Sequence, residues 1–212
     1  MKRTVLLTCA AMALAAATGV RAAVFDFSTP TGDLGTSHTY TVGTLSTTLT
    51  AVGTPAAHLF GKAAGGDENG VGMTNDTTGD GEIQFGKGFV QVDATSLSAV
   101  QLAFNSTTDG EQWSVFGSNT SGVLGSLITS GMAETMTAVL PTFSFYDVES
   151  TTAPGGTSGN NIVLASMTAF AGGTTRGGGV PEPATWTMML IGFGGLGAVL
   201  RRRRAALALG AV

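Results

Sequence analysis

The stretch Leu97-Ser-Ala-Val-Gln-Leu-Ala-Phe104 indicates the fold class of this chain. Its apolar residues Val100, Leu102 and Phe104 alternate with less apolar ones. This period of two is typical of a β-strand with one buried and one exposed face. The stretch therefore predicts a strand of a sheet that covers a core on one side.

Similar short runs lie on both sides of this stretch, and turn-forming pairs such as Asp80-Gly81 and Asp109-Gly110 separate them. The expected strands are 24–28, 39–42, 44–52, 82–85, 89–93, 97–104, 112–116, 137–146 and 162–170. No long apolar pattern with the helical period of 3.6 is present, and no fixed repeat indicates a solenoid. The chain predicts an all-β fold in which residues 23–170 form one antiparallel β-sandwich of jelly-roll type.

The first residues have the pattern of a secretory signal peptide. Lys2 and Arg3 precede an apolar core from about residue 5 to 17, and Val20-Arg21-Ala22 supplies small residues where signal peptidase reads. We expect residues 1–22 to be removed after Ala22. Cys9, the single cysteine of the chain, leaves with them, so the mature protein is expected to have no disulfide and no cysteine metal site.

The C-terminal end has the pattern of a short membrane anchor. Residues 187–200 are fourteen residues without a charge, followed by four arginines. As a helix they span roughly 21 Å, against roughly 30 Å of hydrocarbon. The arginines should stay on the cytoplasmic side, which places the chain before Pro181 outside. Residues 171–180 are expected to be a glycine-rich linker, and residues 205–212 a tail.

These C-terminal residues resemble the PEP-CTERM sorting signal of Gram-negative bacteria, in the variant with a tryptophan three positions after the second proline. The residues that carry the resemblance are Pro181, Glu182, Pro183, Trp186, Met189, the glycine-rich segment 192–197, and Arg201, Arg202, Arg203 and Arg204. The resemblance implies that residues 181–204 are a sorting signal recognised by exosortase, an integral-membrane processing enzyme. It also implies transit through the inner membrane to the cell surface or the medium, often in bacteria that make exopolysaccharide. The family usually ends near its basic cluster, whereas eight residues follow the arginines here.

The charge of the exported part excludes one class of partner. Residues 23–183 contain three basic residues, Lys62, Lys87 and Arg176, and fourteen acidic ones, for a net charge of −11. Nucleic-acid binding relies on clustered lysine and arginine. We therefore expect no nucleic-acid partner.

An acidic segment after residue 65 raises the question of a metal site. The candidate ligands of a structural calcium ion are Asp67, Glu68, Asn69, Asp76 and Asp80, with Glu82 close by. Calcium takes six to eight oxygens from such groups, but the EF-hand pattern fails because Lys87 stands twelfth from Asp76. The alternative is a solvated turn in which Asp and Asn side chains bond their own backbone.

No motif in the sequence assigns a catalytic role. His38 and His58 are the only histidines, and we interpret them as ordinary rather than catalytic or metal-binding. A nucleophile elbow is absent. Trp113 in segment 113–122, which resembles segments of other passengers with this sorting tail, is either a sugar-stacking platform or a core residue.

The sequence thus predicts an exported, non-enzymatic protein with a structural or adhesive role in exopolysaccharide or biofilm. The alternatives are a carbohydrate-binding module, a secreted glycoside hydrolase acting through paired carboxylates, and an ice-binding protein with a threonine-rich face at residues 36–54. No cofactor other than calcium is expected.

Overall fold

The computed structural model describes residues 22–75, 79–107, 110–132, 134–151 and 161–172. The signal peptide, most of the linker, the sorting signal with its expected membrane helix, and the tail lie outside these residues. Among the described residues, no helix has the length and apolarity to cross a membrane.

Thirteen strands make up this part of the chain. They are β1 (Ala23–Asp26), β2 (Gly32–Gly35), β3 (Ser37–Val42), β4 (Leu45–Gly53), β5 (Leu59–Ala63), β6 (Asn69–Met73), β7 (Ile83–Gln84), β8 (Gly88–Asp93), β9 (Leu97–Asn105), β10 (Gln112–Ser118), β11 (Ser126–Gly131), β12 (Phe145–Thr151) and β13 (Asn161–Ala171).

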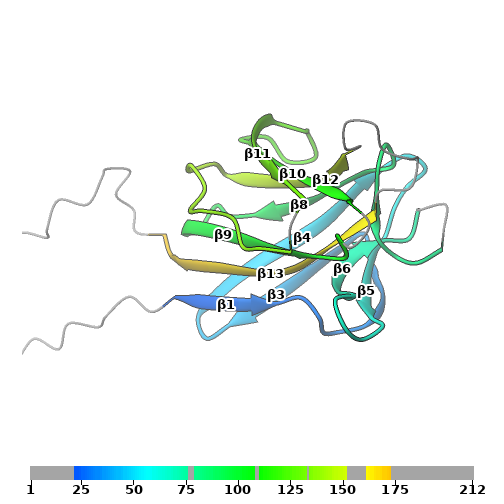
Figure 1. The fold of residues 1–212 in the computed structure, drawn as a ribbon. Helices are drawn as coiled ribbons and strands as arrows, with labels where there is room; N and C mark the ends of the chain where they lie inside the picture. The colour runs from blue at the N-terminus through cyan, green and yellow to red at the C-terminus, as the bar shows by residue number, and fades with distance from the viewer. Residues whose placement is uncertain (1–21, 76–78, 108–109, 133, 152–160, 173–212) are drawn as a thin grey trace, which may run out of the picture. The chain divides into compact units, whose positions relative to one another are not determined.

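The strands form two sheets. Within each sheet, every pair of neighbouring strands is antiparallel. The first sheet has the order β1-β13-β6-β5-β2, with β7 and β9 also paired to β13. The second has the order β11-β10-β12-β8-β4-β3. Figure 1 shows the two layers, with β1 and β13 on one side and β10, β12 and β8 on the other. The prediction of an all-β antiparallel sandwich is confirmed.

A hydrophobic core fills the space between the sheets. Val100, Leu102 and Phe104 of β9 are at most 1% exposed, as the alternation predicted. Trp113 of β10 is 5% exposed and stacks on Phe104 with 4.5 Å between ring centroids. The cluster of buried core residues extends from Ala23 to Ala169. Residues 23–172, called the sandwich domain below, therefore enclose their own core.

The sequence did not predict β2, β5, β6 or β11. Glycine hides the alternation in β6, where Gly70 and Gly72 stand at closely packed positions. A Cβ on Gly72 would lie 2.1 Å from the carbonyl oxygen of Gly81. A Cβ on Gly70, whose φ is +154°, would lie 2.6 Å from the carbonyl oxygen of Leu164. Glycine is required there because two other backbone segments cross the strand.

The expected strand over residues 137–146 is wrong for its first eight residues, because β12 begins only at Phe145. The preceding segment runs beside the outer edge of β9. The amides of Thr137 and Leu140 donate to the carbonyls of Leu102 and Val100, both at 2.8 Å. Pro141 then interrupts the segment, since proline has no amide hydrogen to continue a ladder.

Candidate functional site

The first part of the acidic segment, up to Asn69, forms the turn between β5 and β6 and closes on itself. The side chain of Asn69 accepts a hydrogen bond from the amide of Gly65 at 3.3 Å and donates one to the carbonyl of Gly66 at 3.0 Å. The amide of Glu68 donates to the carbonyl of Gly65 at 3.3 Å. This is the geometry of a turn whose side chains bond their own backbone.

Beside this turn, Lys62 joins two carboxylates that are distant in sequence. Its ammonium lies 2.7 Å from Oε1 of Glu82 and is also paired with Glu68. The hydroxyl of Ser106 donates to Glu82 at 2.8 Å and to Glu68 at 3.2 Å. Glu82 is 4% exposed, so its charge is compensated inside the protein rather than by water. We call these four residues the Lys62 cluster.

The protonation equilibria of the Lys62 cluster reflect the competition between burial and pairing. Burial raises the pKa of Glu82 above its ordinary value, and the hydrogen bonds from Lys62 and Ser106 oppose that shift. The hydrogen bond from Lys62 holds the pKa of the more exposed Glu68 below its usual value. Burial lowers the pKa of Lys62, but its bonds to Glu68 and Glu82 outweigh this and leave it raised. The cluster is therefore a stable arrangement of one cation between two carboxylates.

The structure brings only part of the candidate calcium ligands together. Glu68 and Asn69 lie in the closed turn, Asp67 and Asp80 are exposed, and Asp76 lies outside the described residues. Within the part of the chain that the structure describes, no group of three or more His, Cys, Asp or Glu residues is placed to hold a metal ion. In the described residues, Lys62 is the cation that Glu68 and Glu82 share.

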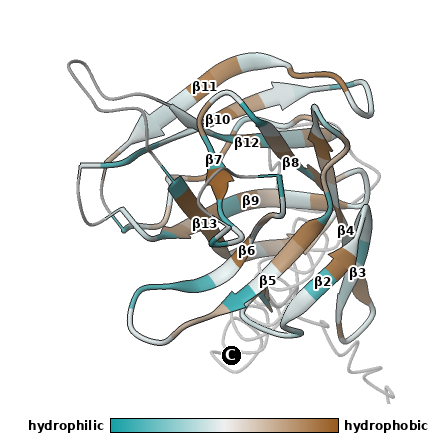
Figure 2. Cartoon of the chain, turned by 90° about the vertical axis from the view of Figure 1, so that its right-hand side faces the viewer, coloured by the Kyte–Doolittle hydropathy of each residue, from teal (hydrophilic) through white to brown (hydrophobic). Residues whose placement is uncertain are grey.

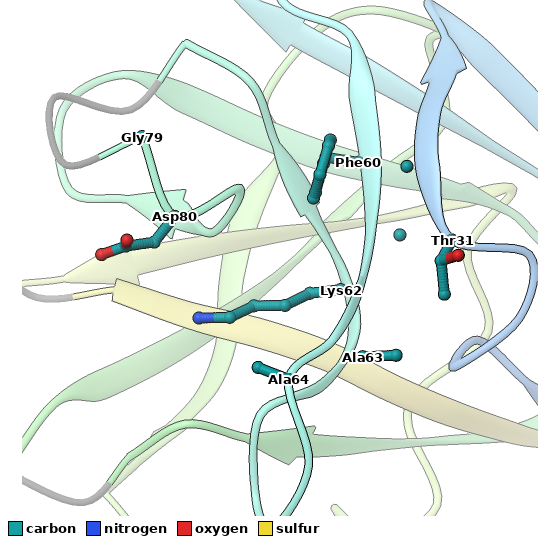
Figure 3. Close-up of a pocket in the computed structure, with 9 residues that line it drawn as sticks. Thr31, Phe60, Lys62, Ala63, Ala64, Gly79 and Asp80 are labelled. Carbon is teal, nitrogen blue, oxygen red and sulfur yellow. The ribbon is translucent and has the colours of Figure 1, made fainter.

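A shallow cavity of about 580 Å³ lies next to the Lys62 cluster, along β5. Thr31, Phe60, Lys62 and Asp80 are among the residues that line it. Figure 3 shows Phe60, Lys62 and Asp80 on one side of β5 and Thr31 on the other. The cavity thus combines an aromatic ring with a hydroxyl, a carboxylate and an ammonium group. These are the groups that bind polar organic ligands such as sugars.

The second singled-out segment, residues 113–122, has a structural explanation. Trp113 is a core residue stacked on Phe104, which confirms the core interpretation and leaves no face for a sugar. The residues after β10 then fold over the outer face of the second sheet. There the amide of Gly122 donates to Oε1 of Gln91 at 2.7 Å, and the amide of Gly125 donates to Oδ2 of Asp147 at 2.9 Å.

Asp147 and Gln91, which hold this loop, were not predicted from the sequence. They are opposite each other on β12 and β8, they are 0% and 2% exposed, and Nε2 of Gln91 donates to Oδ1 of Asp147 at 2.8 Å. Burial raises the pKa of Asp147, while the bonds from Gln91 and Gly125 act in the opposite direction. The available signal was one polar residue between apolar neighbours in each strand, Gln91 between Val90 and Val92 and Asp147 between Tyr146 and Val148. Without the register of the strands it did not reveal a partner.

The two histidines have local roles. Nδ1 of His58 lies 3.0 Å from Oδ1 of Asp33 at the surface. The amide of Gly35 and then His58 hold the pKa of Asp33 below its ordinary value. His38 packs edge-on against Tyr40 with 4.8 Å between centroids. His38 is on β3, whereas His58 precedes β5 and is paired with Asp33 of β2.

The threonine-rich stretch forms a hydroxyl face on β3 and β4. The register sets Ser37 opposite Thr50, Thr39 opposite Thr48, and Thr41 opposite Ser46. The hydroxyls of Thr39 and Thr48 are 2.8 Å apart and share a hydrogen bond. Because Tyr40 and Leu49 on the same strands are buried, the six hydroxyl residues belong to the opposite, outer face.

Residues 179–204 match the family model of the PEP-CTERM protein-sorting motif. The motif residues named above, Pro181 to Pro183, Trp186 and Arg201 to Arg204, fall within this range but outside the described residues. No curated protein and no solved structure matches the chain. The motif implies export, transit through the membrane and processing by exosortase.

Proposed function

We propose that this PEP-CTERM sorting protein is a non-enzymatic component of the cell surface or extracellular matrix. In this proposal the sandwich domain has a structural or adhesive role in exopolysaccharide or biofilm. The observation that carries the proposal is the sorting motif at residues 179–204, placed directly after an acidic all-β domain.

The charges of the chain support the order of events. The sandwich domain contains Lys62 and Lys87 as its only basic residues, whereas four arginines follow the apolar segment. Cytoplasmic flanks of membrane segments are rich in lysine and arginine. The arginines therefore favour a precursor whose acidic domain is outside and whose C-terminal end is inside until processing.

The buried polar groups of the sandwich support a structural rather than a catalytic role. Glu82 accepts bonds from Lys62 and Ser106, and Asp147 accepts bonds from Gln91 and Gly125. In both cases the carboxylate oxygens are used to hold loops against strands. A general acid or base must instead reach a substrate proton.

The sorting part is tested by changing Pro181, Glu182 and Pro183 to alanine in the full chain. Insertion should persist, because the apolar segment is untouched, but processing should fail. The precursor should then accumulate in the inner membrane with Val212 attached, as intact mass and cell fractionation will show. Replacing Arg201 to Arg204 by neutral residues is the contrasting variant, because it should remove the cytoplasmic stop instead. A triple-alanine protein that reaches the surface at the parent mass would contradict the sorting step.

A carbohydrate-binding module is the second candidate, and the cavity beside β5 favours it. Phe60, Thr31 and Asp80 are among the residues that line this cavity, and they offer it an apolar ring and polar groups. Pull-down of the sandwich domain by exopolysaccharide from the producing cells tests this function. Binding that is lost in Asp80→Ala and kept in the exposed-site control Asp67→Ala would support it.

A further inference from the structure

Among the described strands, β11 is at one edge of the second sheet. It pairs with β10 on one side and ends the strand order of that sheet. Ser126, Leu127 and Ser130 are exposed. An open edge presents unpaired backbone N–H and C=O groups, and the partner that satisfies them is another strand.

The segment that forms this edge exposes large apolar side chains and carries no charge of its own. Val123, Leu124, Leu127 and Met132 are 52%, 39%, 60% and 54% exposed, and we call them the β11 patch. Figure 2 shows the hydrophobic colour on β11 and on the loop that joins it to β10. No charged residue occurs between Gln112 and Met132. An apolar, uncharged edge strand lacks the charges and prolines that keep sheet edges apart.

The other sheet edges differ from β11. The segment with Thr137 and Leu140 bonds to the outer edge of β9. β1 and β2 have four residues each and carry Asp26 and Asp33. β3 presents serine and threonine. Among the described edge strands, β11 thus has the most exposed large apolar side chain, Leu127, with Val123, Leu124 and Met132 exposed in the residues that flank it.

We propose that the β11 edge pairs with the β11 edge of a second copy of this chain. The charge of the domain favours the β11 edge as the place where a second copy binds. Two copies that each carry a large negative net charge repel one another over most of their surface. The repulsion is weakest at residues 112–132, because these twenty-one consecutive residues carry no charged side chain. Self-pairing across a two-fold axis sets the two strands antiparallel and joins the two six-stranded sheets into one.

The position of the chain ends gives the pair an adhesive geometry. Ala23 is opposite Ala169, so β1 begins and β13 ends at the same end of the sandwich, as Figure 1 shows. A two-fold pair carries two such ends, one from each copy, and therefore two points of attachment. Such a pair can connect two anchored copies of the chain, which deepens the proposed adhesive role and rests on it.

The association is tested with the sandwich domain in sedimentation velocity at increasing concentration. We expect a concentration-dependent dimer, with slower hydrogen exchange of the amides of residues 126–131 in the dimer and unchanged exchange in β3. Leu127→Lys should keep the fold but remove the dimer. Val24→Lys is the matched control, because it places the same charge at a 56% exposed valine of β1 and should leave the dimer intact. A monomer at all concentrations, or equal effects of the two lysines, would overturn the proposal.

The adhesive geometry is tested with beads that carry the domain by its C-terminal end. Parent and Val24→Lys beads should clump, and Leu127→Lys beads should remain dispersed. A soluble dimer whose beads never clump would overturn the connecting role of the pair. These outcomes are independent of the sorting experiment, which reads processing and location. A chain that is sorted normally but stays monomeric would refute this inference alone.

Discussion

Two buried carboxylates hold two surface loops of the sandwich by different means. Glu82 is held by a cation, with Nζ of Lys62 at 2.7 Å, whereas Asp147 accepts hydrogen bonds from two neutral donors, the side-chain amide of Gln91 and the backbone amide of Gly125. Both carboxylates have a pKa raised by burial. A cation that compensates a buried charge makes the site sensitive to loss of that cation. A carboxylate compensated by dipoles is instead sensitive to its own protonation.

The largest effect should come from removing the cation. Lys62→Met keeps the length of the side chain but leaves Glu82 buried and without its ammonium partner. Breaking a buried pair in this way costs about 3–5 kcal/mol. We expect a loss of that size in the free energy of unfolding of the sandwich domain, measured by urea denaturation at neutral pH.

Two further variants sharpen this test. Lys87→Met removes the other lysine of the domain, which makes no ion pair among the described residues, and should change stability by less than about 0.5 kcal/mol. Adding Glu82→Gln to Lys62→Met should restore part of the lost stability, because no buried charge then remains without its partner. Equal losses for the two lysine variants would show that Lys62 does not compensate Glu82.

A smaller, pH-dependent effect should follow from Asp147→Asn. At neutral pH the asparagine amide can accept from only one of the two donors, and an unsatisfied buried donor costs about 1–3 kcal/mol. Because the pKa of Asp147 is raised in the folded state, the folded protein binds its proton more readily than the unfolded chain. The parent therefore gains stability relative to the variant as pH falls through the folded pKa toward 3.8.

The measurement is the difference in unfolding free energy between parent and Asp147→Asn at several pH values from 7 to 4. Using the difference removes the contributions of all other titrating groups, Glu68 included. Asp67→Asn, at an exposed carboxylate, is the matched control. A difference that shrinks on acidification would contradict the direction assigned to Asp147.

The sequence predicted the architecture where side chains alternate and missed it where glycines replace them. β9 and β13 have long apolar alternations, so they were recognised, whereas β2 and β6 each contain two glycines. The same limit applies to the site. The acidic turn was visible, but Lys62 lies 20 positions from Glu82. They meet because residues 81 and 82 pack against β6, the strand next to β5. Asp147 and Gln91 are 56 positions apart and meet only through the register of β12 and β8.

The smallest effect should be that of calcium on the parent domain. Glu68 and Glu82 already share Lys62, and the amide of Asn69 is bonded within its own turn. Millimolar calcium should therefore leave the melting temperature unchanged within error. A ligand raises the melting temperature only if it binds the folded state more tightly than the unfolded one. If calcium does raise it, and Asp67→Ala abolishes the rise, the calcium interpretation of the acidic segment holds instead.

The comparison is sharpest in Lys62→Met, where the two carboxylates have lost their shared cation. Calcium should there recover part of the lost stability, and chelator should remove it again. If the ion stabilises Lys62→Met no more than the parent, the carboxylates are not placed to share a cation, and the equivalence between Lys62 and a metal ion fails.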